Sequence, residues 1–158
     1  MTSQQRKNLE AYIERYYCSY FQMDSIYNDW ASANKIQDTS LFVLNEISKQ
    51  EVCTQRSLRD RLGYSKQTIS SALRRLEAAG IIVRQRAPQD QRNNLIRLTS
   101  NGKEYADSIL SRLRNAEVHA FQSWSEAETE EILTAFQKLT SALFQSLQAD
   151  INAQSEDP

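Results

Sequence analysis

Residues that break helices are scarce in this chain, and this scarcity constrains the fold more than any other feature. Only three glycines and two prolines occur among the 158 residues. Because both types are strongly disfavoured inside helices, the chain is expected to be mostly helical with short connections. Gly63 and Gly80 each follow a helical pattern, and glycine adopts the left-handed conformation of a C-terminal cap without steric cost. Two helices are therefore predicted to end at these glycines.

Apolar spacing and capping residues predict six helices. The first starts near Leu9 and ends at about residues 34–37, with apolar positions alternately four and three apart, as in a helix packed against helices. The other five begin at residues that can cap a helix N-terminus: Asp38 or Thr39, Thr54, Ser65, Thr99, and Ser125 with Glu128 as a capping box. The fifth is expected to reach about Ser123, and the residues after Ile151 are expected to be frayed.

The apolar period changes after Gly80. Residues 81–86 and 94–98 are short runs rich in β-branched residues, separated by the polar stretch 87–93. Such runs predict a β-hairpin with a seven-residue tip. The expected fold class is therefore mainly α with a small β-hairpin wing, in the order helix, tight turn, helix and hairpin of a winged helix-turn-helix.

Charge is segregated along the chain, although the net charge is only −1. Residues 55–103 contain eleven lysines and arginines against three acids, a local balance of +8, so the remainder carries −9. A basic middle between acidic ends fits a nucleic-acid-binding face on a solvated scaffold. A basic segment can also be simply a solvated surface, so the motifs decide between the two interpretations.

The fourth helix supplies the expected DNA-reading residues. With Ile69, Leu73 and Leu76 directed inward, its polar residues are suited to base edges and phosphates. The expected contacts of this recognition helix are Ser65, Lys66, Gln67, Thr68, Ser70, Ser71, Arg74 and Arg75. The expected contacts of the wing are Arg84, Arg86, Asp90 and Arg92. Asp90 either braces the Arg92 guanidinium for a minor groove or only caps the backbone of a turn, and spacing alone leaves both open.

An ordered set of motifs resembles the MarR family of bacterial transcriptional regulators over nearly the whole chain. The matching segments are Thr54–Gly63 (third helix), Tyr64–Ser70 (start of the recognition helix), Leu76–Ile82 ("LExxGLI"), Asp90–Arg92 ("DxR" of the wing) and Leu98–Lys103 ("LTxxGK"). The chain departs from the pattern at Arg59, where the family usually has alanine, and at Asn93–Asn94, where a small or aliphatic residue often follows the wing arginine.

The resemblance implies a homodimer whose first, fifth and sixth helices interlock and whose recognition helices enter successive major grooves of a palindromic operator. The apolar stripes of the first and last helices support this interpretation, because each needs a partner to exclude water. The chain is expected to be one compact domain with an N-terminal dimerisation helix (1–37), a winged helix-turn-helix region (38–100), C-terminal dimerisation helices (101–153) and a tail (154–158). Neither a signal peptide nor a membrane span is evident, so a cytoplasmic protein is expected.

The resemblance further implies a repressor released from DNA by a small, often phenolic or aromatic, effector. Tyr16, Tyr20, Tyr27 and Trp30 can line its pocket, although an aromatic stripe at helical spacing more often belongs to a core or a dimer seam. Some relatives sense oxidants through a cysteine of the first helix near tyrosines, and Cys18 has that setting. An inert packed thiol is the alternative, since Arg15 is the only nearby cation.

Other chemistry has little support in the sequence. The two cysteines, Cys18 and Cys53, have no CxxC or histidine-rich neighbourhood, and the single histidine, His119, has no second ligand at metal spacing, so neither a metal nor a cofactor is expected. Cys53 is expected to fill a buried strand position. The absence of a glycine-rich phosphate loop, a nucleophile elbow and a histidine–carboxylate pair argues against an enzyme. A winged-helix module that binds protein or RNA remains the alternative outside DNA recognition.

Overall fold

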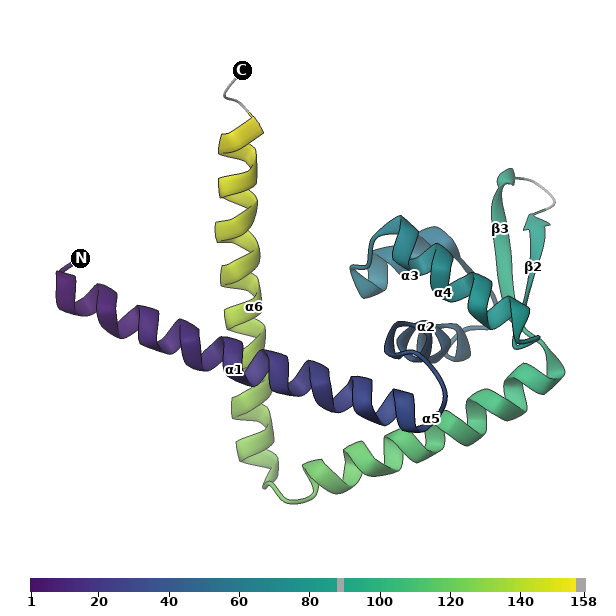
Figure 1. Cartoon of the computed structure of the whole chain (residues 1–158), viewed down its shortest axis with the longest axis horizontal. Coiled ribbons are helices and arrows are strands. Elements are labelled where there is room, and N and C mark those ends of the chain that lie inside the picture. The colour runs from purple at the N-terminus through teal and green to yellow at the C-terminus, as the bar shows by residue number, and fades with distance from the viewer. Residues whose placement is uncertain (88–89, 156–158) are drawn as a thin grey trace. The chain divides into compact units, whose positions relative to one another are not determined.

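The computed structural model describes residues 1–87 and 90–155, and side chains within 1–86 and 94–154. The elements are mostly helices with a small antiparallel sheet, which confirms the expected fold class (Figure 1). Their bounds are α1 (Ser3–Ala33), α2 (Asp38–Ser48), β1 (Cys53–Thr54), α3 (Gln55–Leu62), α4 (Lys66–Ala78), β2 (Ile82–Ala87), β3 (Asp90–Leu98), α5 (Ser100–Phe121) and α6 (Glu126–Ser155). The chain divides into two compact units, Met1–Leu110 and Ser111–Pro158, and each is described by itself. The division lies inside α5, so the expectation of a single compact domain stays a prediction.

Local sequence determines the helix boundaries of the first unit. Thr54 caps α3 through a hydrogen bond to its Oγ1 from the Ser57 N–H at 3.1 Å, and α3 ends at Gly63, whose φ of 69° is left-handed. Ser65 caps α4 in the same way, accepting from the Thr68 N–H at 3.0 Å. These ends agree with the sequence prediction. The α4 helix itself ends at Ala78, shortly before the left-handed Gly80.

The core of the first unit lies where α2, α3 and α4 meet the sheet. Its fully buried large side chains are Leu41, Val43, Leu44, Ile47, Leu58, Ile69, Leu73 and Ile96. They come from three helices and from β3, so the apolar face of each element is buried by the other elements. Burial of each such side chain contributes about 1.5–3 kcal/mol relative to exposure, so this cluster fixes the orientation of α4.

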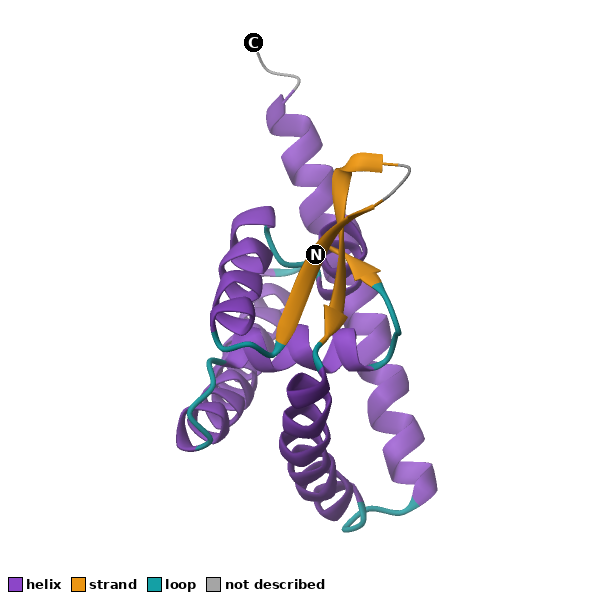
Figure 2. Ribbon diagram, turned by 90° about the vertical axis from the view of Figure 1, so that its right-hand side faces the viewer, coloured by secondary structure: helices purple, strands orange, loops and turns teal. Residues whose placement is uncertain are grey.

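The wing is longer than the sequence predicted. The sheet has the order β1–β3–β2, with Arg84 opposite Ile96 and Cys53 also opposite Ile96 on the other edge. Figure 2 shows the β2–β3 hairpin extending beyond α3 and α4. The residues near the end of the hairpin are mostly polar, so they form no apolar face. The alternation of apolar and polar residues that predicts a strand therefore could not reveal them. The predicted tip of residues 87–93 is therefore wrong in length, because β2 extends to Ala87 and β3 starts at Asp90.

A compact corner joins α4, β2 and α5. The Thr99 N–H donates to the Ile81 carbonyl at 3.0 Å, and the Thr99 hydroxyl donates to the Gly80 carbonyl at 2.7 Å. Gly102 lies against the same corner, where a Cβ atom would be 1.8 Å from the Ile81 oxygen. The glycine of the "LTxxGK" motif is thus required by the close approach of the α5 N-terminus to the chain leaving α4.

The second unit contains the rest of α5 and α6. Ser125 and Glu128 form the predicted capping box, with the Ser125 N–H donating to Glu128 Oε2 at 2.9 Å and the Glu128 N–H donating to Ser125 Oγ at 3.3 Å. The α6 helix continues to Ser155, beyond Ile151 where fraying was expected, and residues 156–158 of the predicted tail lie outside the described residues. No helix in the described part of the chain is both long enough and apolar enough to span a bilayer.

Large apolar side chains are exposed on two helices of the single chain. On α1 they include Leu9, Tyr12, Ile13, Tyr20, Phe21, Met23 and Ile26. On α6 they include Ile132, Leu133, Phe136, Leu139, Phe144, Leu147 and Ile151. Such contiguous apolar faces are unusual on monomeric proteins and are typical of interaction surfaces.

Candidate nucleic-acid interface

The outward face of α4 carries polar and basic side chains. Ile69, Ala72, Leu73 and Leu76 are buried, which leaves the opposite face of the helix in solvent. Of the residues predicted to read DNA, Ser65, Lys66, Gln67 and Arg74 are exposed, and Thr68, Ser70, Ser71 and Arg75 are half-buried. The spacing of Gln67, Ser70 and Arg74 places them along one side of the helix.

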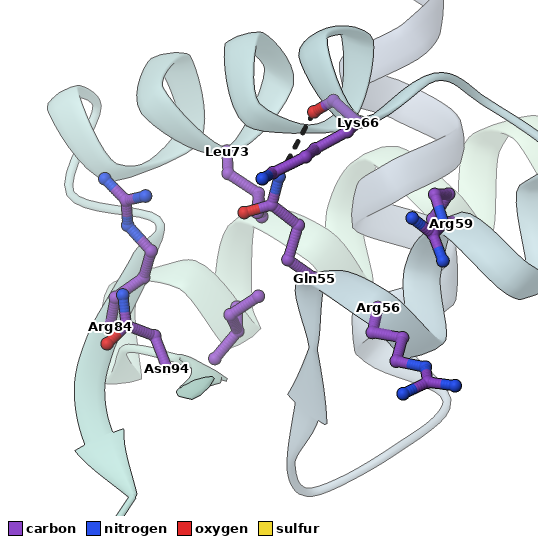
Figure 3. Close-up of a pocket in the computed structure, with 8 residues that line it drawn as sticks. Gln55, Arg56, Arg59, Lys66, Leu73, Arg84 and Asn94 are labelled. Atoms are coloured by element: carbon purple, nitrogen blue, oxygen red, sulfur yellow. Dashed lines mark hydrogen bonds between the residues drawn. The ribbon is translucent and has the colours of Figure 1, made fainter. Parts of the chain in front are cut away.

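The N-terminus of α4 is built from several of these same residues. The hydroxyls of Ser65 and Thr68 lie 2.8 Å apart, and Ser65 accepts the Thr68 N–H, so both side chains form the helix cap. The Gln55 side-chain amide donates to the Lys66 carbonyl at 3.1 Å and thereby ties α3 to α4 (Figure 3). Lys66 keeps its ammonium group exposed beside this N-terminus, where the helix dipole favours anions.

Arg75 is directed toward α2 and not along the outward face of α4. Its guanidinium donates to Ser71 Oγ at 2.9 Å, to Ser40 Oγ at 3.2 Å and to Thr39 Oγ1 at 3.3 Å. Within the described residues no carboxylate forms an ion pair with Arg75, so hydroxyl groups are its acceptors there. Arg75 therefore links α4 to the N-terminus of α2.

The wing arginines have different environments. The Arg84 guanidinium is bound to the Glu77 carboxylate at the end of α4, with the Nε–Oε2 distance at 2.9 Å, whereas Arg86 is exposed. The hydrogen bond from Arg84 lowers the pKa of Glu77 below its usual value, and the same bond raises the pKa of Arg84. The side chains of Asp90 and Arg92 lie outside the described residues, so the proposed brace between them stays a prediction.

A basic groove lies between α3, α4 and the wing. Its volume is about 380 Å³, and its polar lining comes from Gln55, Arg56, Arg59, Lys66, Arg84 and Asn94 (Figure 3). Sequence reasoning did not include Arg56 and Arg59 in the site. They lie three positions apart on the exposed side of α3, opposite the buried Leu58, and this periodicity is the feature by which they could have been found. Asp60 lies 3.8 Å from Arg56 and 3.3 Å from Arg59, so one acid is shared by two arginines.

A second cavity of about 480 Å³ lies between the start of α2, the end of α4 and the start of α5. Arg75, Ser40 and Asn101 supply polar groups, and Leu76, Ile81 and Tyr105 supply apolar surface. Burial raises the pKa of the Tyr105 hydroxyl, which therefore remains protonated at neutral pH. The volume is within the range of small-molecule sites.

The aromatic residues of α1 predicted to line an effector pocket do not form one group. Tyr27 packs on Phe42 of α2 with ring centroids 5.4 Å apart, whereas Tyr16 contacts Tyr20 of its own helix at 6.1 Å. Tyr20 is exposed, and Tyr16, Tyr27 and Trp30 are half-buried. None of the four lines either cavity described above. Tyr27 at least belongs to the contact between α1 and α2.

The two cysteines differ in accessibility. Cys18 is exposed on α1, and Cys53 is buried on β1, where burial raises the pKa of its thiol to about 11. Cys53 therefore occupies the buried strand position expected from the sequence and is a poor nucleophile. The described residues contain no group of three potential metal ligands, and the redox role considered for Cys18 stays a prediction.

Comparisons with known proteins agree with this geometry. The sequence profile of the MarR family matches residues 35–93. The transcriptional regulator SarZ of Staphylococcus epidermidis is 26% identical over 139 residues, covering 85% of this chain and 93% of SarZ. The regulator NMB1585 of Neisseria meningitidis, a MarR family protein, superposes with a TM-score of 0.76 at 19% identity, covering 87% of this chain and 97% of NMB1585.

Two further solved structures are informative because of what they contain. MepR of S. aureus, solved as a DNA complex, is 23% identical with a TM-score of 0.74, covering 84% of this chain and 97% of MepR. PcaV of Streptomyces coelicolor, solved with its natural ligand, is 20% identical with a TM-score of 0.69, covering 78% of this chain and 90% of PcaV.

The family match covers the segment that contains α2, α3, α4 and the start of the wing, and the similarity to SarZ extends over most of the chain. SarZ is described as a transcriptional regulator, which agrees with the expectation that the chain is not an enzyme. The order of elements, the polar face of α4 and the projecting hairpin show a winged helix-turn-helix fold like that of NMB1585, and residues 35–93 are similar to the MarR family.

Proposed function

We propose that this chain is a homodimeric, sequence-specific repressor that binds palindromic double-stranded DNA in the cytoplasm and is released by a small-molecule effector. The observation that carries the proposal is the outward strip of α4, where Lys66, Gln67, Ser70 and Arg74 lie beside a hairpin with the exposed Arg86. A helix and a hairpin presented together match the major and minor grooves of one duplex.

Each side chain of the strip has a specific role in this proposal. Gln67 pairs with an adenine edge, Arg74 with guanine or a phosphate, and Ser70 with either type of base. Lys66 binds a phosphate at the N-terminus of α4. The groove arginines Arg56 and Arg59 extend the phosphate contacts onto α3, and they add affinity without sequence preference.

The dimer is supported by the exposed apolar faces of α1 and α6. A second copy of the chain would exclude water from these faces and present a second recognition helix. Two copies also double the number of neutralised phosphates, which a module of this size needs for tight binding at physiological salt. Light scattering during size-exclusion chromatography measures the mass, and a dimer mass supports the assignment.

The effector is proposed to bind in the cavity of about 480 Å³ beside Arg75, in preference to the aromatic residues of α1. Arg75 offers a cation to an acidic ligand, and Leu76 and Tyr105 offer apolar surface. An acid bound here competes with Ser40 and Thr39 for the guanidinium, and this competition changes how α4 is held by α2. Benzoate and phenol, titrated into the DNA complex, distinguish an acidic from a neutral aromatic effector.

The experiment that tests DNA recognition is selection of bound duplexes from a random pool at near-physiological salt. Enrichment of a palindrome with half-sites about one helical turn apart is the expected result. Gln67→Ala should relax preference at particular base pairs, and Arg6→Ala, an exposed arginine of α1 paired with Glu10 at 2.9 Å, serves as the control. Absence of enrichment with folded parent protein would refute sequence-specific recognition.

A further inference from the structure

The ion pair between Glu77 and Arg84 connects the recognition helix to the wing. Two N–H groups of the Arg84 guanidinium donate to the same carboxylate oxygen of Glu77, one of them at 2.9 Å. Among the contacts of the described residues, this is the side-chain hydrogen bonding that joins α4 to the hairpin. The base of the hairpin is also held by apolar packing of Ile82 and Ile96 in the core, and backbone hydrogen bonds are formed at the corner, such as the Ile81 N–H donating to the Leu76 carbonyl at 2.9 Å.

The register of the sheet places Arg84 on the side of the hairpin that faces the helices. Ile82 is buried on β2, and Arg84 is two residues further along, so its side chain points to the same face. It lies opposite the buried Ile96 of β3, which confirms this orientation. The side chain of Arg84 is only 25% exposed and that of Glu77 is 38% exposed. Arg84 is therefore committed to Glu77, and Arg86 is the arginine of β2 that is free to reach DNA.

The negative charge of Glu77 would not by itself favour DNA binding. Glu77 is on the helix proposed to enter the major groove, where a carboxylate repels phosphates. The pair with Arg84 neutralises this charge and connects the last turn of α4 to the middle of β2. Beyond Arg84 the hairpin projects from the core, so a small change in its direction moves the tip by a larger distance.

We propose that Glu77 and Arg84 are positioning residues that set the angle between the recognition helix and the wing, and that Arg84 does not contact DNA. This inference rests on the proposed function, since it concerns how the two DNA-binding elements are held for simultaneous insertion. Loss of the pair leaves each element intact but lets the wing adopt directions in which it misses the minor groove.

The test uses an operator selected by the parent protein and compares Glu77→Gln with Arg84→Gln. Each is expected to bind about threefold to tenfold more weakly, because a partly exposed pair has a modest coupling. The double variant should lose little more than either single variant. The reversed pair, Glu77→Arg with Arg84→Glu, should bind better than Arg84→Glu alone. The slope of affinity against salt should stay unchanged in Arg84→Gln, since no phosphate contact is removed.

Whether Glu77→Gln weakens or strengthens DNA binding distinguishes a positioning role of Arg84 from a direct contact of Arg84 with DNA. If Arg84 instead contacts a phosphate, Glu77→Gln frees it and binds more tightly than the parent, and Arg84→Gln lowers the salt slope by about one. Either of these results, or binding equal to the parent in all variants, overturns the proposal. Glu51→Gln, which removes an exposed acid before β1, is the matched control for net charge.

Hydrogen exchange on the free protein gives an independent measurement. In Glu77→Gln the β2 amides should exchange faster than in the parent, whereas the α2 amides should be unchanged. Equal exchange in β2 would show that the pair does not hold the wing. If the parent itself selects no duplex, the proposed function fails, and exchange still reports whether the pair holds the wing.

Discussion

Gly102→Ala tests whether the corner between α4, β2 and α5 depends on close backbone approach. An added Cβ would lie 1.8 Å from the Ile81 carbonyl oxygen, whereas Cβ atoms in proteins keep at least 3.0 Å, so the corner must open by about 1.2 Å or more. The hydrogen bonds from Thr99 to Ile81 at 3.0 Å and to Gly80 at 2.7 Å do not survive such a movement.

The expected loss of unfolding free energy follows from three contributions. The two hydrogen bonds contribute about 0.5–1.5 kcal/mol each, and overpacking costs about 1–3 kcal/mol. Alanine is better than glycine inside a helix by about 0.5–1 kcal/mol, which opposes the other two. The net expectation is a destabilisation of about 3 kcal/mol, and wing-dependent DNA binding should weaken with it.

Urea unfolding followed by circular dichroism, at one fixed protein concentration, measures this difference. Gly63→Ala is the matched control, because Gly63 has a φ of 69° and a Cβ added there would meet no atom within 4 Å. It should lose only about 1 kcal/mol, the cost of a left-handed alanine. A Gly102→Ala variant as stable as the parent, or more stable, would refute the reasoning, since helix propensity would then outweigh the contact.

Three further predictions concern single groups. One thiol, that of Cys18, should react with Ellman's reagent in the native protein and a second, that of Cys53, only after unfolding; two rapidly reacting thiols would contradict the burial of Cys53. Glu46 has a pKa lowered by hydrogen bonding with Lys49, so its stabilisation is present above the ordinary pKa of 4.5 and lost as pH falls through the folded pKa; Glu46→Gln should therefore lose less stability on acidification, and equal acid sensitivity would argue against this. Arg59→Ala should reduce the slope of DNA affinity against salt by about one without changing the selected sequence, and an unchanged slope would remove Arg59 from the interface.

The sequence allowed the helical framework to be predicted because its signals are local. Thr54, Ser65 and Ser125 cap helices through hydrogen bonds three residues away, and Gly63 ends α3 by its own backbone conformation. The length of the wing was not predictable in this way, since polar strand residues pair only with each other.

The residues of the candidate site were predicted from their types, but the sequence did not indicate where each side chain points. The outward position of Gln67 and Arg74 follows from helical periodicity. Arg75 points inward because it binds Thr39 of α2, and Arg84 is held by its ion pair with Glu77 of α4. Both partners lie on other elements, so no local sequence pattern specifies them. Arg56 and Arg59, which line the groove from α3, were not among the predicted site residues.

The two-residue strand β1 has a consequence for the order in which the chain folds. Cys53 pairs with Ile96, which is 43 positions later, and this pairing closes the sheet around the helices between them. Closing a loop of that size costs entropy, whereas α2, α3 and α4 can contact each other early. These helices can pack against the sheet only after β3 has been synthesised. We therefore expect α4 to be held firmly in a nascent chain only after β3 has formed, so that the helix and the wing fold together.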